Sequence, residues 1–119
     1  MKIAVTSQGP DLDSDMDPKF GRAAYILIVD TETLEFTALD NSENVNAFKG
    51  AGIQAASMVG NNGARVLLTG FCGPKAFQTL DSVGIKVVND VTGKVRDVVK
   101  TFDYNKAQFA DKANREAHS

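Results

Sequence analysis

The sequence predicts an α/β domain in which helices pack on a mixed five-stranded sheet. Three observations lead to this class. Short apolar runs rich in β-branched residues alternate with turn residues along the chain, and the spacing of apolar residues changes from a strand period to a helical one near residue 50. Strand and helix patterns then alternate, which requires parallel strands joined by crossovers, with helices on the faces of the sheet.

Three strands are expected first. Residues 2–6 (KIAVT) form an apolar run that stops at the turn residues Ser7-Gln8-Gly9-Pro10. Residues 24–30 (AYILIVD) are almost continuously apolar, and residues 34–40 (LEFTALD) alternate between apolar and polar. The connection over residues 31–33 is short enough for an antiparallel hairpin, so the sheet is mixed.

Helices and strands alternate in the remainder. Apolar residues recur at helical spacing over residues 52–61 and 74–83, and short apolar runs at residues 65–69 and 85–88 predict two further strands. Apolar residues at i, i+3, i+4 and i+7 predict a last amphipathic helix over residues 95–102. The expected order is three strands, helix, strand, helix, strand, helix.

The chain is expected to form one domain and a tail. Its 119 residues suffice for a buried core, which we assign to residues 1–102. Residues 103–119 carry few large apolar side chains and mixed charges, so a frayed helix or disorder is expected there.

Composition excludes several classes of protein. The net charge of −2 provides no field for DNA or RNA, so nucleic acid is not an expected partner. No segment reaches the roughly 18 consecutive apolar residues of a membrane-spanning helix, and the first apolar run is too short for a signal peptide. With a single cysteine and no expected membrane partner, a cytoplasmic location is predicted.

Ligands collect in such sheets beyond the carboxyl ends of the strands. The loops after the first, third and fourth expected strands are predicted to meet there. Two of them place glycines directly before a helix, so that backbone N–H groups of the first turn face the loop and attract anions. A pocket for a bulky anion is therefore predicted; the alternative is that the glycines only make tight turns. The predicted binding residues are Phe20, Gly21, Arg22, Lys49, Gly50, Gly52, Gly70, Phe71 and Gly73. The alternative for Phe20 is that it caps the core, and the alternative for Arg22 is that it pairs with an acidic neighbour such as Asp17.

Cys72 directly precedes Gly73 and Pro74, close to the start of the helix predicted over residues 74–83. A thiol near a helix N-terminus can have a lowered pKa and act as a nucleophile or a metal ligand. The alternative is a small apolar residue that fills space beside Phe71. The only histidine, His118, lies in the predicted tail, so a Cys–His catalytic pair is not expected.

Three segments carry a family resemblance. DPKFGRA (residues 17–23), GAGIQAA (50–56) and TGFCGPKA (69–76), in this order of elements, resemble the dinitrogenase iron-molybdenum cofactor biosynthesis family over residues 1–102. The resemblance implies a ribonuclease H-like fold. It also implies a non-enzymatic protein that binds and carries or stores an anionic molybdenum-containing metal-sulfide cluster. For one member this is a molybdenum-copper sulfide held without covalent attachment, and a related molybdenum-iron-sulfur cluster is the other form expected.

The resemblance also suggests roles for single residues. Backbone N–H groups, Arg22 and Lys49 would offset the negative charge of the cluster. The apolar side chains expected to cover its sulfides are Met16, Phe20, Phe48 and Phe71. Family members often have a histidine where this chain has Lys49, so Cys72 is left as the predicted metal ligand.

Two other functions are compatible with the residues. The first is a thiol-dependent redox sensor or enzyme that uses Cys72, and the second is a regulatory module that binds a partner protein. For the cluster-binding function, the expected partners are the cluster itself and cluster-assembly or acceptor proteins, without nucleic acid or membrane.

Overall fold

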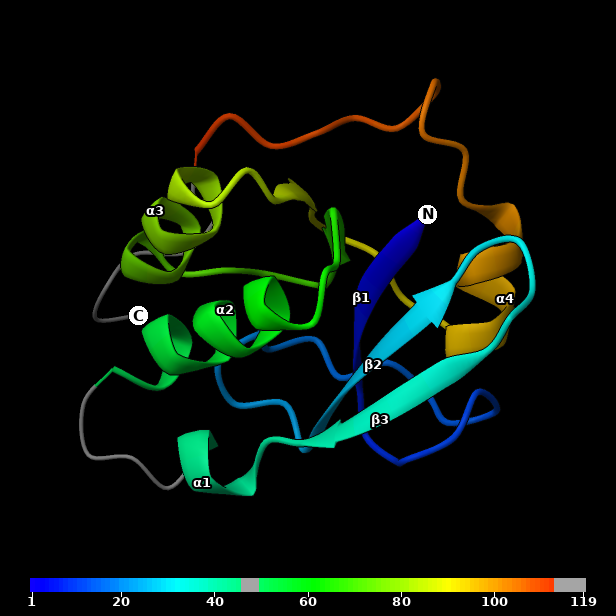
Figure 1. Cartoon of the computed structure of the whole chain (residues 1–119), viewed down its shortest axis with the longest axis horizontal. Helices are drawn as coiled ribbons and strands as arrows, with labels where there is room; N and C mark the ends of the chain where they lie inside the picture. The colour runs from blue at the N-terminus through cyan, green and yellow to red at the C-terminus, as the bar shows by residue number, and fades with distance from the viewer. Residues whose placement is uncertain (46–49, 113–119) are drawn as a thin grey trace.

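The computed structural model describes residues 1–45 and 50–112, and within these ranges it contains one five-stranded sheet in the order β3-β2-β1-β4-β5 (Figure 1). The strands of the described part are β1 (Lys2–Ser7), β2 (Tyr25–Asp30), β3 (Phe36–Asp40), β4 (Val66–Leu68) and β5 (Lys86–Val88). Its helices are α1 (Ser42–Val45), α2 (Ala51–Asn61), α3 (Pro74–Ser82) and α4 (Val95–Thr101).

The strand pairing confirms the mixed sheet. β1 pairs antiparallel with β2 and parallel with β4, while β2–β3 is antiparallel and β4–β5 is parallel. β1 is the middle strand, and its residues from Ile3 to Ser7 are buried. The carboxyl ends of β1 and β4 therefore lie side by side, and the loops that leave them start at the same edge.

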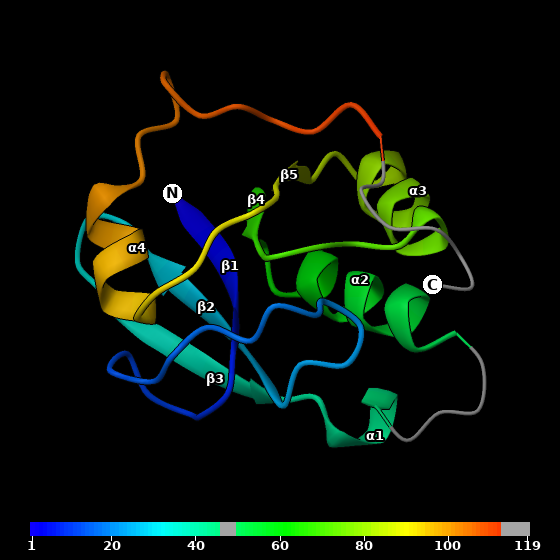
Figure 2. The same cartoon turned by 180° about the vertical axis from the view of Figure 1, so that it is seen from behind.

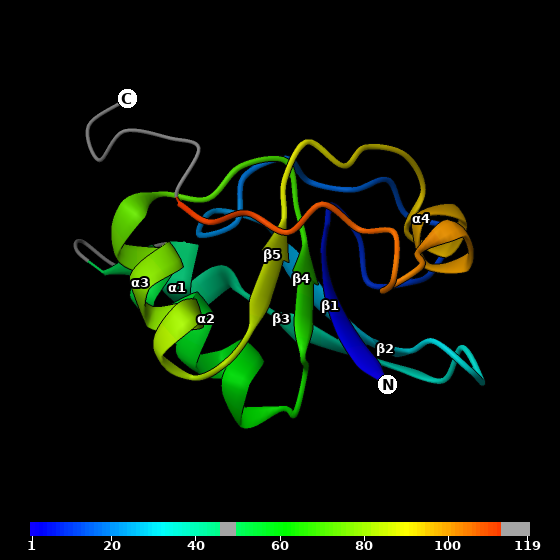
Figure 3. The same cartoon turned by 90° about the horizontal axis from the view of Figure 1, so that it is seen from above.

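Helices cover both faces of the sheet. α2 and α3 lie on one face and α4 lies on the other (Figure 3). The first face is closed largely by small residues of α2, among them Ala55, Ala56 and Val59, so this helix approaches the sheet closely. On the other face, Val95 and Val99 of α4 pack with side chains of the loop after β1, which is thereby tied to the core.

The segment after α4 differs from the expectation of a frayed helix or disorder. Residues 103–112 form no helix and cross β5 from the side of α4 toward α3 (Figure 3). The backbone N–H of Ala110 donates to the carbonyl oxygen of Val87 at 2.7 Å, and Phe109 packs into the apolar cluster on the side of α4. We call this segment the strap. The expectation for residues 113–119 lies outside the described residues.

Two further observations complete the fold. The short helix α1, between β3 and α2, was not predicted. Within residues 1–45 and 50–112, no helix has both the length and the apolar character that crossing a membrane requires.

Candidate functional site

Two buried threonines anchor the loop after β1. Thr6 is the penultimate residue of β1 and Thr69 follows β4, and both residues are fully buried. The hydroxyl of Thr6 donates to the carbonyl oxygen of Asp17 and contacts the hydroxyl of Thr69 at 3.2 Å, and the latter reaches the carbonyl oxygen of Pro18 at 3.5 Å. The loop is thus held over the carboxyl ends of both strands.

Backbone hydrogen bonds then join this loop to the loop after β4. The N–H of Phe71 donates to the carbonyl oxygen of Pro18 at 2.8 Å, and the N–H of Phe20 donates to the carbonyl oxygen of Phe71 at 3.2 Å. These bonds extend the sheet pairing beyond the strands by one bridge, between Lys19 and Phe71. Two of the three loops with predicted site residues are therefore fixed to each other.

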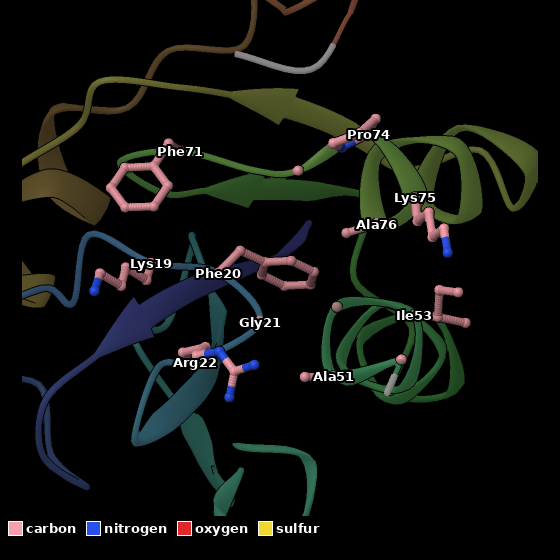
Figure 4. A pocket seen from close by; sticks show the side chains of 13 residues that line it. Lys19, Phe20, Gly21, Arg22, Ala51, Ile53, Phe71, Pro74, Lys75 and Ala76 are labelled. Atoms are coloured by element: carbon pink, nitrogen blue, oxygen red, sulfur yellow. The ribbon is translucent and has the colours of Figure 1, made fainter. Parts of the chain in front are cut away.

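A hollow of about 490 Å³ lies between these loops and the N-terminal ends of α2 and α3 (Figure 4). The predicted residues that line it are Phe20, Gly21, Arg22, Gly50, Gly52, Phe71 and Gly73. Gly70 does not line it but packs on Pro18, whose carbonyl oxygen would lie 2.7 Å from a Cβ at position 70. Lys49 and Phe48 lie outside the described residues. Binding of a ligand by these residues stays a prediction.

Three small residues bring the walls of the hollow together. A Cβ on Gly52 would lie 2.9 Å from the Cβ of Ala76, and a Cβ on Gly21 would lie 3.0 Å from the backbone of Gly52. The loop after β1, α2 and α3 therefore meet at van der Waals distance (Figure 2). Gly21 lines the hollow, and its missing side chain also permits close approach of α2.

The two helices that face the hollow lack the usual N-terminal groups. In the described part of the chain, no side chain caps α2 or α3, and neither helix has an acidic residue in its first turn. α1 and α4 each have one, Glu43 and Asp97. First-turn amides have no acceptor within their own helix, and the N-terminal end of a helix is electropositive. An anion in the hollow would meet two such ends.

The side chains at the hollow add to this positive potential. Arg22 and Lys75 come from opposite sides, the first from the loop after β1 and the second from α3, whereas Lys19 extends away from the centre (Figure 4). Among the described residues that line the hollow, none is acidic. Lys75 stands in the first turn of α3, where a cation opposes the helix dipole. The positive charge of Lys75 is therefore expected to lower the stability of α3.

Several lining residues were not predicted. They are Lys19, Ala51, Ile53, Pro74, Lys75 and Ala76. Ile53, an apolar residue of α2, is 38% exposed and lines the hollow. For Lys75 the sequence did contain a signal, namely a lysine directly after a proline that begins a helix.

Arg22 does not pair with Asp17, the alternative considered from the sequence. Its Nη1 donates to the carbonyl oxygen of Val45, at the end of α1, at 2.9 Å. Arg22 also borders a second hollow of about 390 Å³, which Asp17, Tyr25 and Asp40 line as well. Arg22 thus stands in the wall between the two hollows.

Cys72 is buried beneath the site. It is 1% exposed, it does not line the hollow, and its Sγ lies 3.6 Å from the carbonyl oxygen of Gly73. Burial raises the pKa of the thiol to about 12, so the neutral thiol predominates at neutral pH. To act as the predicted metal ligand, the sulfur would have to leave this buried position.

The Cys72 thiol is expected to make stability depend on alkaline pH. Because the folded state keeps a proton that the unfolded state releases above about pH 9, the free energy of unfolding should fall as pH rises from about 9 toward about 12. This contribution is at most about 1.4 kcal/mol per pH unit. Urea unfolding at pH 8, 9 and 10 measures it, with Cys72→Ala as the control for other titrating groups. Equal pH dependence in both proteins would contradict the prediction.

Comparisons with known proteins agree with this fold. The sequence profile of a family described as dinitrogenase iron-molybdenum cofactor matches residues 1–105. The apo form of the orange protein from Desulfovibrio gigas is 45% identical, with 96% of each chain covered and a TM-score of 0.90. A putative NifB protein from Thermotoga is 28% identical, with 91% of each chain covered and a TM-score of 0.76. An uncharacterized protein of Methanocaldococcus jannaschii is 31% identical over 86% of this chain and 85% of its own.

Proposed function

The chain belongs to the dinitrogenase iron-molybdenum cofactor family, and on this premise we propose that it binds and carries or stores an anionic molybdenum-containing metal-sulfide cluster. The cluster is the cargo of the protein, held without covalent attachment. The observation that carries the proposal is the hollow onto which two helix N-termini without capping side chains converge.

The chemistry of the hollow fits such a cargo. Sulfide-bridged molybdenum clusters are anions with large, polarisable surfaces. Amide N–H groups and the cations Arg22 and Lys75 would offset the charge, while the apolar surfaces of Phe71, Ile53 and Pro74 would contact sulfides. Within residues 1–45 and 50–112, no group of three or more His, Cys, Asp or Glu residues could hold a metal ion. The donor set therefore suits a cluster whose metals already have all their ligands.

The finer parts of the proposal follow from the family resemblance. They are a molybdenum-copper sulfide composition, a ribonuclease H-like fold, a cytoplasmic location, and exchange of the cluster with assembly or acceptor proteins. The sheet order β3-β2-β1-β4-β5 supports the fold. The described lining offers no carboxylate, imidazole or thiol for acid–base or nucleophilic catalysis, which supports a carrier over an enzyme.

Reconstitution with tetrathiomolybdate and a copper salt tests the function. A charge-transfer absorption that remains with the protein through desalting is expected, together with molybdenum and copper in metal analysis. If the parent protein retains neither metal nor colour, the proposed function is wrong.

A pair of glycine variants tests the place of binding. Gly50 and Gly63 have φ values of 79° and 78°, and a Cβ at either position would meet no atom within 4 Å. Gly50→Ala and Gly63→Ala therefore carry the same backbone strain, on the order of 1 kcal/mol. Only Gly50 lies at the hollow, so cluster affinity is expected to fall about 10-fold in Gly50→Ala alone. Equal affinities in absorbance titrations would place the cluster elsewhere.

A further inference from the structure

We propose that Asn41 is a positioning residue that holds Arg22 at the wall of the anion hollow. The inference rests on the proposed function, because Arg22 matters there as a cation for the cluster. Asn41 directly follows β3 and was not among the predicted site residues. It is one of four buried polar or charged residues in the described part of the chain, and it is fully buried.

The side-chain amide of Asn41 fixes the backbone on both sides of Arg22. Its Nδ2 donates to the carbonyl oxygen of Ala23 at 2.8 Å and to that of Gly21 at 3.4 Å. The backbone N–H of Asn41 donates to the carbonyl oxygen of Ala24 at 3.0 Å. Asn41 thereby fixes the backbone conformation on both sides of Arg22, whose side chain carries the guanidinium group.

The other groups of Asn41 hold α1. Its Oδ1 accepts a hydrogen bond from Nδ2 of Asn44 at 2.6 Å, and its backbone carbonyl accepts one from the N–H of Val45 at 3.0 Å. Val45 in turn accepts the bond from Nη1 of Arg22 at 2.9 Å. The contacts form a closed ring from the loop after β1 through Asn41 and α1 back to the guanidinium of Arg22.

The second hollow explains why this ring would matter. An exposed arginine has many rotamers, and Asp17 and Asp40 both lie in the lining that Arg22 shares with the second hollow. Yet Arg22 forms no ion pair with Asp17 or Asp40 in the described structure. With Nη1 engaged by Val45, the remaining N–H donors of the guanidinium stay available to an anion. The ring keeps the positive charge from being neutralised by the two carboxylates.

A double-mutant cycle tests the inference, with tetrathiomolybdate as the probe in absorbance titrations. Arg22→Gln is expected to lower affinity about 10-fold in the parent protein but less than about 2-fold in Asn41→Leu, because the guanidinium is already misplaced there. Lys75 lies on the other side of the hollow, so Lys75→Gln is expected to lower affinity equally in the parent protein and in Asn41→Leu. The salt dependence of binding in Asn41→Leu should fall to that of Arg22→Gln, which a merely structural role would not cause.

The outcomes separate the inference from the function. If Arg22→Gln has the same effect with Asn41 and with Leu at position 41, the positioning role is refuted and the anion site stands. If the parent binds no probe, the proposed function fails first. Because Asn41→Leu alters a buried residue, Asn44→Ala provides a second background, since Asn44 is only half-buried and its loss removes the side-chain hydrogen bond between Asn41 and α1. Loss of the Arg22→Gln effect is expected there too, and its full retention would count against the ring.

Discussion

Lys75→Glu is expected to stabilise the protein without ligand and to weaken cluster binding at least about 10-fold. The lysine opposes the dipole of α3, whereas a glutamate in the first turn would favour it, so unfolding should become harder by about 1 kcal/mol. The same change replaces attraction for an anion by repulsion. Thermal unfolding without ligand and absorbance titration with tetrathiomolybdate measure the two effects.

Lys100→Glu is the matched control for this variant. Lys100 lies in the last turn of α4, on the other face of the sheet, where a cation is favourable. The same change of charge should therefore lower stability and leave binding unchanged. If Lys75→Glu destabilised the unliganded protein, or bound the probe as tightly as the parent, the assignment of Lys75 to an anion site would be wrong.

Removal of the strap by truncation after Phe102 is expected to lower the free energy of unfolding by about 2 kcal/mol. Half of this comes from the packing of Phe109, which is half-buried, and half from the hydrogen bond between Ala110 and Val87. For a domain of this size the loss corresponds to about 8 °C in Tm. Calorimetry of the truncated and full chains measures it.

Truncation after Lys112 controls for loss of the chain end as such. It retains the whole strap, and its Tm is the reference against which the loss of the strap is measured. Phe109→Ala isolates the packing contribution and should fall between the two. Equal stability of the chain ending at Phe102 and the full chain would mean that residues 1–102 suffice as the folding unit, as the sequence suggested.

Much of the fold could be predicted because each strand has a local signature. The third strand shows the limit of such signatures. It was expected to begin at Leu34, but Leu34 has a φ of 63° in the turn, and β3 begins at Phe36. Leu34 is apolar because it packs on the cluster beside α4, not because it belongs to the strand. α1 was missed because four residues are too few to show a helical period.

The site was predictable only in part, for a similar reason. Glycines before helices are visible in a sequence, and so the loops around the hollow were found. The hydrogen bond from Arg22 to Val45 joins residues 23 positions apart, and no local sequence pattern around either residue predicts it. The strap was predicted to be a tail because its half-buried residues, Ala107, Phe109 and Ala110, follow neither a helical nor a strand period.

The contact among Gly21, Gly52 and Ala76 has a consequence for how constant the hollow is. The distance between the first-turn N–H groups of α2 and those of α3 is set there by van der Waals contact. Such contacts do not respond to ionic strength, unlike the interactions of the charges around the rim. Salt should therefore change how strongly the opening attracts its cargo while its dimensions stay the same.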